Sequence, residues 1–168
     1  MAMKRTKLIN DPAELVALFR SVDSPGRRAV LARLAEGWTP SSELQSSFGE
    51  EAFGAITYFE KFKLVESRWE VLDGKPEKAY RTFYNAFQIS TSLNFVEARE
   101  LLTVVLMKET EFEALEVKIL EMVGEEGCFA NDISRELELT SLQLKGLVRR
   151  SVKFDHRGHN IVPIKEEK

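Results

Sequence analysis

LVESRWEVLDGKPEKAYRTFY, residues 64–84, gives the clearest indication of how this 168-residue chain folds. Residues 64–72 are extended in character, DGKP at 73–76 favours a tight turn, and residues 79–84 alternate aromatic with polar side chains. This pattern predicts a β-hairpin. Helical segments precede it, and helices followed by a hairpin of this size are typical of a winged helix-turn-helix, with the hairpin as the wing.

Four helices are expected upstream of the hairpin, because apolar residues recur there at helical spacing between start and stop signals. Asp11-Pro12 and Ser24-Pro25 each offer a capping side chain followed by proline, which suits the first helical position. Gly37 and Gly49 are good stop signals. The expected helices cover residues 11–22, 24–37, 39–49 and 50–62.

The second half of the chain repeats this order in shortened form. Its last helix begins with a capping box, in which Thr140 and Gln143 each bond the backbone of the other. A small hairpin follows, as it does after the first set of helices. The expected segments are helices at residues 95–107, 109–123, 131–137 and 140–151 and a hairpin at 152–164.

The chain is therefore predicted to be mainly α with small β-hairpin wings, arranged as a tandem winged helix-turn-helix. Residues 11–90 would form the first domain, and residues 91–165 a linker or dimerisation helix with a second, smaller winged helix. Residues 101–107 are apolar almost all round. The segment 95–107 is therefore expected to form the interface of a homodimer, with the first helix as a possible contributor.

Composition excludes several classes of protein. Hydrophobic residues make up 43% and charged residues 30%, which is typical of a globular protein, and no apolar run approaches the roughly 20 residues of a membrane span. The single cysteine, Cys128, excludes an internal disulfide and suits the cytoplasm. We find no phosphate loop, nucleophile elbow or zinc-protease motif, so neither an enzyme nor a cofactor is expected. His156 and His159 lack a third ligand nearby, so no metal is expected.

The wing motif carries a resemblance to a known family. Gly74-Lys75-Pro76-Glu77-Lys78-Ala79-Tyr80 is similar to the wing of ArsR and PadR regulators, residues 24–37 resemble the second helix of the ArsR-like group, and residues 59–65 resemble the end of its recognition helix. Among these, the chain is most similar to ArsR-like regulators of archaea. The resemblance implies a dimeric transcription factor whose fourth helix enters the major groove. Metal-sensing members carry cysteine pairs on the helix matching residues 41–48, and this chain has none there.

Charge distinguishes the two expected recognition helices. With Ile56 at the centre of the buried face, the helix at 50–62 presents Glu50, Glu51, Gly54, Tyr58 and Lys61 outward, and its carboxylates would repel phosphate. With Leu144, Leu147 and Val148 inward, the helix at 140–151 presents only cations among its charged residues. These outward cations are Lys145, Arg149 and Arg150, followed in the wing by Lys153 and Arg157.

The second unit is therefore the better DNA contact, with Gln143 and Lys145 expected to touch bases and Arg149, Arg150 and Arg157 to touch phosphates. Arg27, Arg28 and most of these cations also have a simpler interpretation as solvated surface. The full set of candidate DNA contacts is Arg27, Arg28, Tyr58, Lys61, Lys75, Lys78, Gln143, Lys145, Arg149, Arg150, Lys153 and Arg157.

Two functions fit these features. The first is a sequence-specific transcriptional regulator that binds double-stranded DNA as a cytoplasmic homodimer, without a membrane partner. The alternative is a tandem winged-helix scaffold that binds proteins, as in chromosome-segregation or sorting complexes. The acidic outward face of the first unit and the net charge of −3 favour this alternative.

Overall fold

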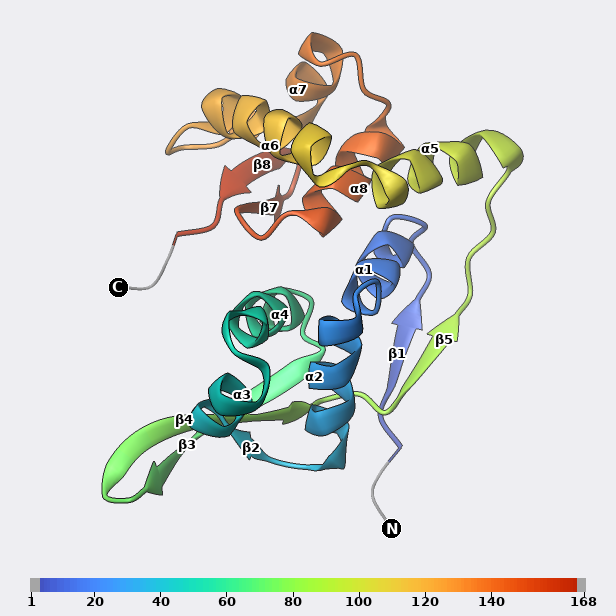
Figure 1. Ribbon diagram of the computed structural model, residues 1–168. Coiled ribbons are helices and arrows are strands. Elements are labelled where there is room, and N and C mark those ends of the chain that lie inside the picture. Colours follow the sequence, from blue (N-terminus) through green and yellow to red (C-terminus); the bar gives the residue numbers. More distant parts are fainter. Residues whose placement is uncertain (1–3, 166–168) are drawn as a thin grey trace. The chain divides into compact units, whose positions relative to one another are not determined.

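The computed structural model describes residues 4–165, which contain eight α-helices and three small β-sheets (Figure 1). The prediction of a mainly α chain with small hairpins is confirmed. Each predicted helix is present with bounds within a few residues of those expected. No helix in the described range is both long enough and apolar enough to span a bilayer.

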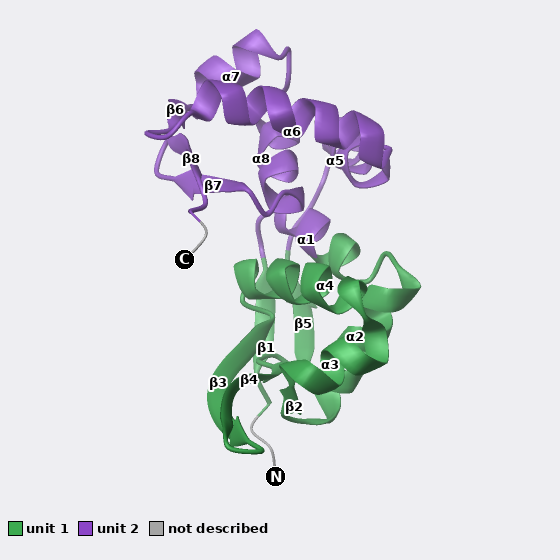
Figure 2. Ribbon diagram, turned by 60° about the vertical axis from the view of Figure 1, so that its left-hand side comes forward, with its two compact units in different colours: residues 1–9, 18–90 green, residues 10–17, 91–168 purple. Residues whose placement is uncertain are grey.

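The chain divides into two compact units, coloured separately in Figure 2. Unit 1 holds the described residues up to Ile9 together with Leu18–Ser90, and unit 2 holds Asn10–Ala17 and the described residues from Thr91 onward. The helix α1 (Glu14–Ser21) therefore begins in unit 2 and ends in unit 1.

Unit 1 is built from three helices and an antiparallel sheet in the strand order β2-β4-β3. The β-hairpin turns at Asp73-Gly74, and both residues have positive φ, which suits the glycine in particular. Ser24 caps the first of these helices by accepting a hydrogen bond from the Arg27 N–H at 3.1 Å. The elements are α2 (Pro25–Glu36), β2 (Thr39–Pro40), α3 (Ser41–Phe48), α4 (Glu50–Lys61), β3 (Val65–Leu72) and β4 (Lys75–Thr82).

Unit 1 also contains a parallel strand pair that was not expected, β1 (Thr6–Ile9) with β5 (Ala86–Ile89). Thr6 pairs with Ala86 and Ile9 with Ile89, so the partners are 80 residues apart in the sequence. A four-residue strand has too short a pattern to be recognised without its partner.

Unit 2 repeats the order helix, short strand, helix, helix, hairpin. Its sheet has the strand order β6-β8-β7, which corresponds to β2-β4-β3 in unit 1. Leu147, Phe154 and Ile161 are fully buried in its core. The elements are α5 (Phe95–Leu106), α6 (Glu109–Val123), β6 (Cys128–Phe129), α7 (Ala130–Glu136), α8 (Ser141–Arg150), β7 (Phe154–Arg157) and β8 (Asn160–Pro163).

The helices α5 and α8 approach closely at Gly146. A Cβ atom at this position would lie 3.3 Å from a methyl group of Val104 and 3.4 Å from one of Val16, so a larger residue would crowd both valines. Both valines are buried, and the burial of each side chain stabilises the fold by about 1.5–3 kcal/mol. The N-terminal turn of α1 is therefore part of the core of unit 2.

Candidate nucleic-acid interface

The helix α8 begins with the expected capping box. The Thr140 hydroxyl accepts from the Gln143 N–H at 3.1 Å, and the Gln143 side-chain carbonyl accepts from the Thr140 N–H at 3.0 Å. The cap thus occupies the carbonyl oxygen of Gln143. A base contact by Gln143 would have to use the amide nitrogen of the side chain, or break the cap.

The orientation of α8 is as expected for its apolar residues, since Leu144, Leu147 and Val148 are all buried. Lys145 is exposed on the opposite side and Arg149 is half-buried. In the hairpin that follows, Arg157 is exposed at the end of β7. Within residues 4–165, neither Lys145 nor Arg157 forms an ion pair with a carboxylate, so both charges face solvent.

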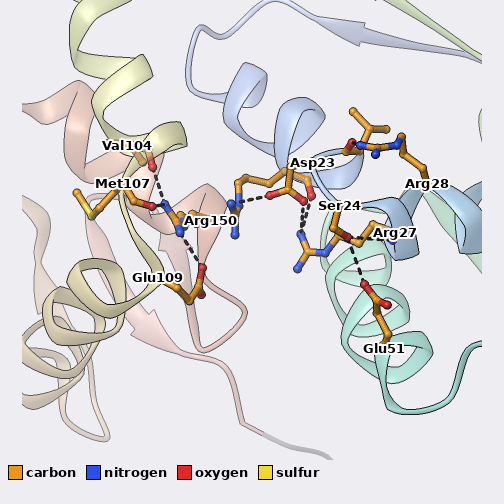
Figure 3. A network of polar contacts seen from close by, with 11 residues as sticks. Asp23, Ser24, Arg27, Arg28, Glu51, Val104, Met107, Glu109 and Arg150 are labelled. Atoms are coloured by element: carbon orange, nitrogen blue, oxygen red, sulfur yellow. Dashed lines mark hydrogen bonds and ion pairs between the residues drawn. The ribbon is translucent and has the colours of Figure 1, made fainter.

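The prediction that Arg150 is exposed and contacts DNA was wrong. Its side chain is only 2% exposed. Nη1 donates to the backbone carbonyls of Val104 and Met107, both at 2.8 Å, and Nη2 donates to the Glu109 carboxylate at 2.8 Å (Figure 3). Its guanidinium also lies 4.4 Å from the centre of the Phe112 ring. Arg150 therefore ties the end of α8 to the junction of α5 and α6.

The reason for this burial can be seen in the helix geometry. Position 150 follows the buried Leu147 by three residues, so both side chains lie on one side of α8. The last carbonyls of α5 have no partner within their own helix, and a guanidinium can donate to two of them at once. An amphipathic pattern that counts every arginine as outward misses this use.

Lys153 is also engaged within unit 2. Its Nζ lies 2.7 Å from a carboxylate oxygen of Glu116, while the other oxygen of this carboxylate accepts from the Ser151 hydroxyl at 2.6 Å. Glu116 is buried, whereas about half of the Lys153 side chain is exposed. Lys153 thus neutralises a buried carboxylate, and binding of a phosphate would compete with this role.

A cleft of about 330 Å³ lies beside Lys145, lined by α7, α8 and the β7–β8 hairpin. Both histidines of the chain line it. The sequence indicates no cleft at these histidines, because nothing local shows that the wing folds back beside α7. The other polar side chains lining the cleft are those of Asn131, Ser134 and Ser141.

In unit 1, the prediction that Tyr58 faces outward from α4 was wrong. Tyr58 is 1% exposed, and the Arg27 guanidinium lies 4.4 Å from its ring centre. The buried arc of α4 is wide, because α2, α3 and β3 all pack against this helix. Ala52, Ile56 and Phe59 are buried as expected.

The exposed ridge of α4 is acidic and apolar. It carries Glu50 and Glu60, with Phe53 between them at 63% exposed. The Glu51 carboxylate lies at the start of α2, where it accepts a hydrogen bond from the Ser24 hydroxyl at 3.4 Å. A Cβ at Gly26 would clash with that carboxylate at 1.9 Å. Lys61 is half-buried, and its Nζ is 5.2 Å from the ring centre of Phe62.

The two arginines that begin α2 hold the preceding turn. Arg27 donates to the Arg20 carbonyl at 2.6 Å and Arg28 to the Val22 carbonyl at 2.7 Å. Arg27 is also 4.0 Å from Asp23. Arg27 thus has a structural role, while Arg28 combines such a contact with an exposed position.

Of the wing cations in unit 1, Lys75 is exposed at the hairpin tip. The Nζ atom of Lys78 lies 4.0 Å from a carboxylate oxygen of Glu60. Glu77 caps α3 by accepting from the Ser41 hydroxyl at 3.0 Å and from the Ser42 N–H. Hydrogen bonds from Ser42, and a weaker one from Ser41, lower the pKa of Glu77 below its ordinary value of 4.5.

Comparison with known proteins agrees with this description. The sequence model of the ArsR transcriptional regulator matches residues 9–165, a range that includes nearly all described residues of both units. No curated protein sequence matches the chain significantly. The resemblance inferred from the wing motif is thereby confirmed: the chain belongs to the ArsR family of transcriptional regulators.

Proposed function

We propose that this protein is a sequence-specific DNA-binding regulator of the cytoplasm, built as a tandem winged helix-turn-helix. The domains would span residues 11–90 and 91–165. The repeated order of elements and the matching strand orders of the two sheets support this interpretation. The helix pairs α3–α4 and α7–α8 then correspond to the two helix-turn-helix motifs, and the β3–β4 and β7–β8 hairpins to the two wings.

The charge on the exposed side of α8 supports unit 2 as the principal DNA contact. Lys145 lies in the first half of α8, the part that reads bases in a helix-turn-helix, whereas Arg149 and Arg157 are suited to phosphates. The buried Arg150 is removed from the set of contacts. Gln143 and Lys153 remain secondary candidates, because each already has a partner within the protein.

Unit 1 would contribute less to the affinity for DNA. Its α4 ridge carries Glu50 and Glu60, whose carboxylates repel phosphate, and Lys78 forms an ion pair with Glu60. Lys75 and Arg28 are the exposed cations that remain as candidate backbone contacts, while Arg27 and Lys61 are half-buried. Metal sensing through cysteines of α3 has no residues to support it, since α3 contains none.

A homodimer formed through α5 is part of the proposal. Leu101 and Val104 are buried within unit 2, but the other side of α5 exposes Phe95 at 95%, Leu102 at 50% and Leu106 at 74%. These three residues line one broad depression along the helix. Burying such a stripe against the same stripe of a second copy would give the two-fold symmetry that matches two DNA half-sites.

The scaffold alternative is favoured by one observation, the exposed Phe53 between two glutamates on α4. A large apolar residue in an acidic setting suits a protein partner better than a DNA groove.

An electrophoretic retardation assay against genomic fragments, at 50 and 200 mM salt, separates the two functions. A regulator is expected to retain preferred fragments at both salt concentrations, while a scaffold retains none. A variant with Phe53→Ala should leave DNA binding unchanged under the first proposal. Loss of DNA binding in this variant would instead assign the contact to unit 1.

A further inference from the structure

The cleft between α7, α8 and the β7–β8 hairpin holds every histidine of the chain. The sequence contains only two histidines, His156 and His159, and both line this cleft together with Lys145. The hydroxyls of Ser134 and Ser141 and the amide of Asn131 provide additional hydrogen-bonding groups. The cleft therefore combines one fixed positive charge with two groups that can acquire a charge.

The backbone fixes the position of His159 even though it lies near the hairpin tip. The His159 carbonyl accepts from the Ala130 N–H at 2.9 Å, which ties the tip to the start of α7. The imidazole makes an edge contact with the Phe129 ring, with the two centres 6.4 Å apart. Next to it, Asn160 pairs with Phe129 in the antiparallel sheet.

We propose that this cleft binds a phosphate group of the DNA backbone and takes up protons on His156 and His159 as it does so. This inference rests on the proposed DNA-binding function. A phosphate diester only accepts hydrogen bonds and carries a negative charge. A neutral imidazole has one donor and one acceptor, whereas a protonated one has two donors and a positive charge. The bound phosphate therefore favours the protonated form.

The other charged groups around the cleft do not replace this effect. From α8 comes the exposed cation Lys145. On α7, Asp132 and Arg135 form an ion pair with each other. On β7, the Asp155 carboxylate accepts from the backbone N–H of His156 at 2.8 Å, not from its imidazole, and Arg157 adds an exposed cation.

The size of the effect follows from proton linkage. One typical imidazole that is neutral in the free protein at pH 7.5 and must be protonated in the complex raises the affinity by about tenfold from pH 7.5 to pH 5.5. Two such histidines would raise the affinity by up to about a hundredfold over the same pH interval. No other histidine can produce this dependence, because the chain has none.

The test is fluorescence anisotropy with a labelled duplex at pH 5.5, 6.5 and 7.5 and constant ionic strength. An arbitrary duplex is sufficient, because phosphate contacts do not depend on base sequence. The wild-type protein should gain at least about tenfold in affinity on acidification, and His159→Gln should lose about tenfold of that gain. Lys145→Gln should weaken DNA binding by the same factor at pH 5.5, 6.5 and 7.5. Lys118→Gln, which removes an exposed cation of α6 outside the cleft, is the matched control and should leave the pH dependence unchanged.

A double variant, His156→Gln with His159→Gln, decides whether the two histidines cause the pH dependence of DNA binding. If it keeps the wild-type pH dependence, the inference is overturned, although the proposed function stands as long as DNA is bound. If the wild-type protein binds no DNA at any pH, the proposed function itself fails. NMR of the histidine ring protons distinguishes a phosphate of the DNA backbone from a free phosphate ion. Changes in the chemical shifts of these protons on adding the duplex support the DNA backbone as the ligand of the cleft. Saturating shifts with low millimolar inorganic phosphate alone would overturn this assignment in favour of a free anion.

Discussion

Replacing Arg150 by alanine should destabilise unit 2 strongly. The substitution removes two 2.8 Å hydrogen bonds to the carbonyls of Val104 and Met107 and the contact with the Phe112 ring. Leaving a buried acceptor unsatisfied costs about 1–3 kcal/mol, so two such carbonyls and the lost packing give about 3–5 kcal/mol. The ion pair with Glu109 adds little, because 59% of the Glu109 side chain is exposed.

Urea unfolding followed by two signals measures this loss. Both tryptophans, Trp38 and Trp69, belong to unit 1, so their fluorescence reports on that unit, while far-UV circular dichroism reports on the helices of both. In Arg150→Ala, the part of the dichroism transition that belongs to unit 2 should move to much lower urea concentration.

Two control variants make this prediction specific. The neighbouring Arg149→Ala should change the free energy of unfolding by less than about 1 kcal/mol, since the Arg149 side chain is only half-buried, whereas that of Arg150 is 2% exposed. Arg150→Met should recover part of the loss, because it restores packing against Phe112 without the hydrogen bonds. If Arg150→Ala unfolds within about 1 kcal/mol of the wild type, the assigned role of this buried arginine is refuted.

Three further outcomes are expected. Glu77→Gln should reduce thermal stability in calorimetry above pH 4.5, and this loss should shrink as the pH falls below 4.5, because a carboxylate whose pKa is lowered by folding stabilises the fold above its unfolded pKa and ceases to do so as the pH falls through its folded pKa; an equal loss at every pH would contradict the capping role. Leu102→Glu with Leu106→Glu should convert a dimer into a monomer in light scattering, and a wild-type monomer at micromolar concentration would exclude the α5 interface. Thr140→Ala should cost about 0.5–2 kcal/mol of unfolding free energy, because it removes the hydroxyl that accepts from the Gln143 N–H at the start of α8, and no change in urea unfolding would show that the cap contributes nothing.

The sequence predicted those features of the fold that depend on local signals. The bounds of α6 at Glu109 and Val123 and the capping box of Thr140 and Gln143 were predicted correctly, because start and stop signals lie next to the segments they delimit. The β1–β5 pair was missed, since its strands lie far apart in the sequence and are only four residues long.

The site was harder to predict, because exposure depends on neighbouring elements as well as on a helix's own pattern. Arg150 and Tyr58 were assigned to outward faces by their position on an isolated helix. In the folded chain, the α5–α6 junction covers Arg150, and the Arg27 guanidinium lies against the Tyr58 ring. The cleft at His156 and His159 likewise arises from three elements, none of which indicates it alone.

The salt dependence of DNA binding is the most direct test of the claim that unit 2 contacts DNA through α8 and its wing. Association constants should be measured between 50 and 200 mM salt for the wild type and for Arg149→Ala with Arg157→Ala, with Lys75→Ala and Lys118→Ala as a control pair that also removes two cations. Each phosphate contact contributes about 0.9 to the slope of log K against log salt, so the first pair should flatten the slope by about two and the second pair by at most about one. An unchanged slope in the first pair, with affinity kept, would contradict the account.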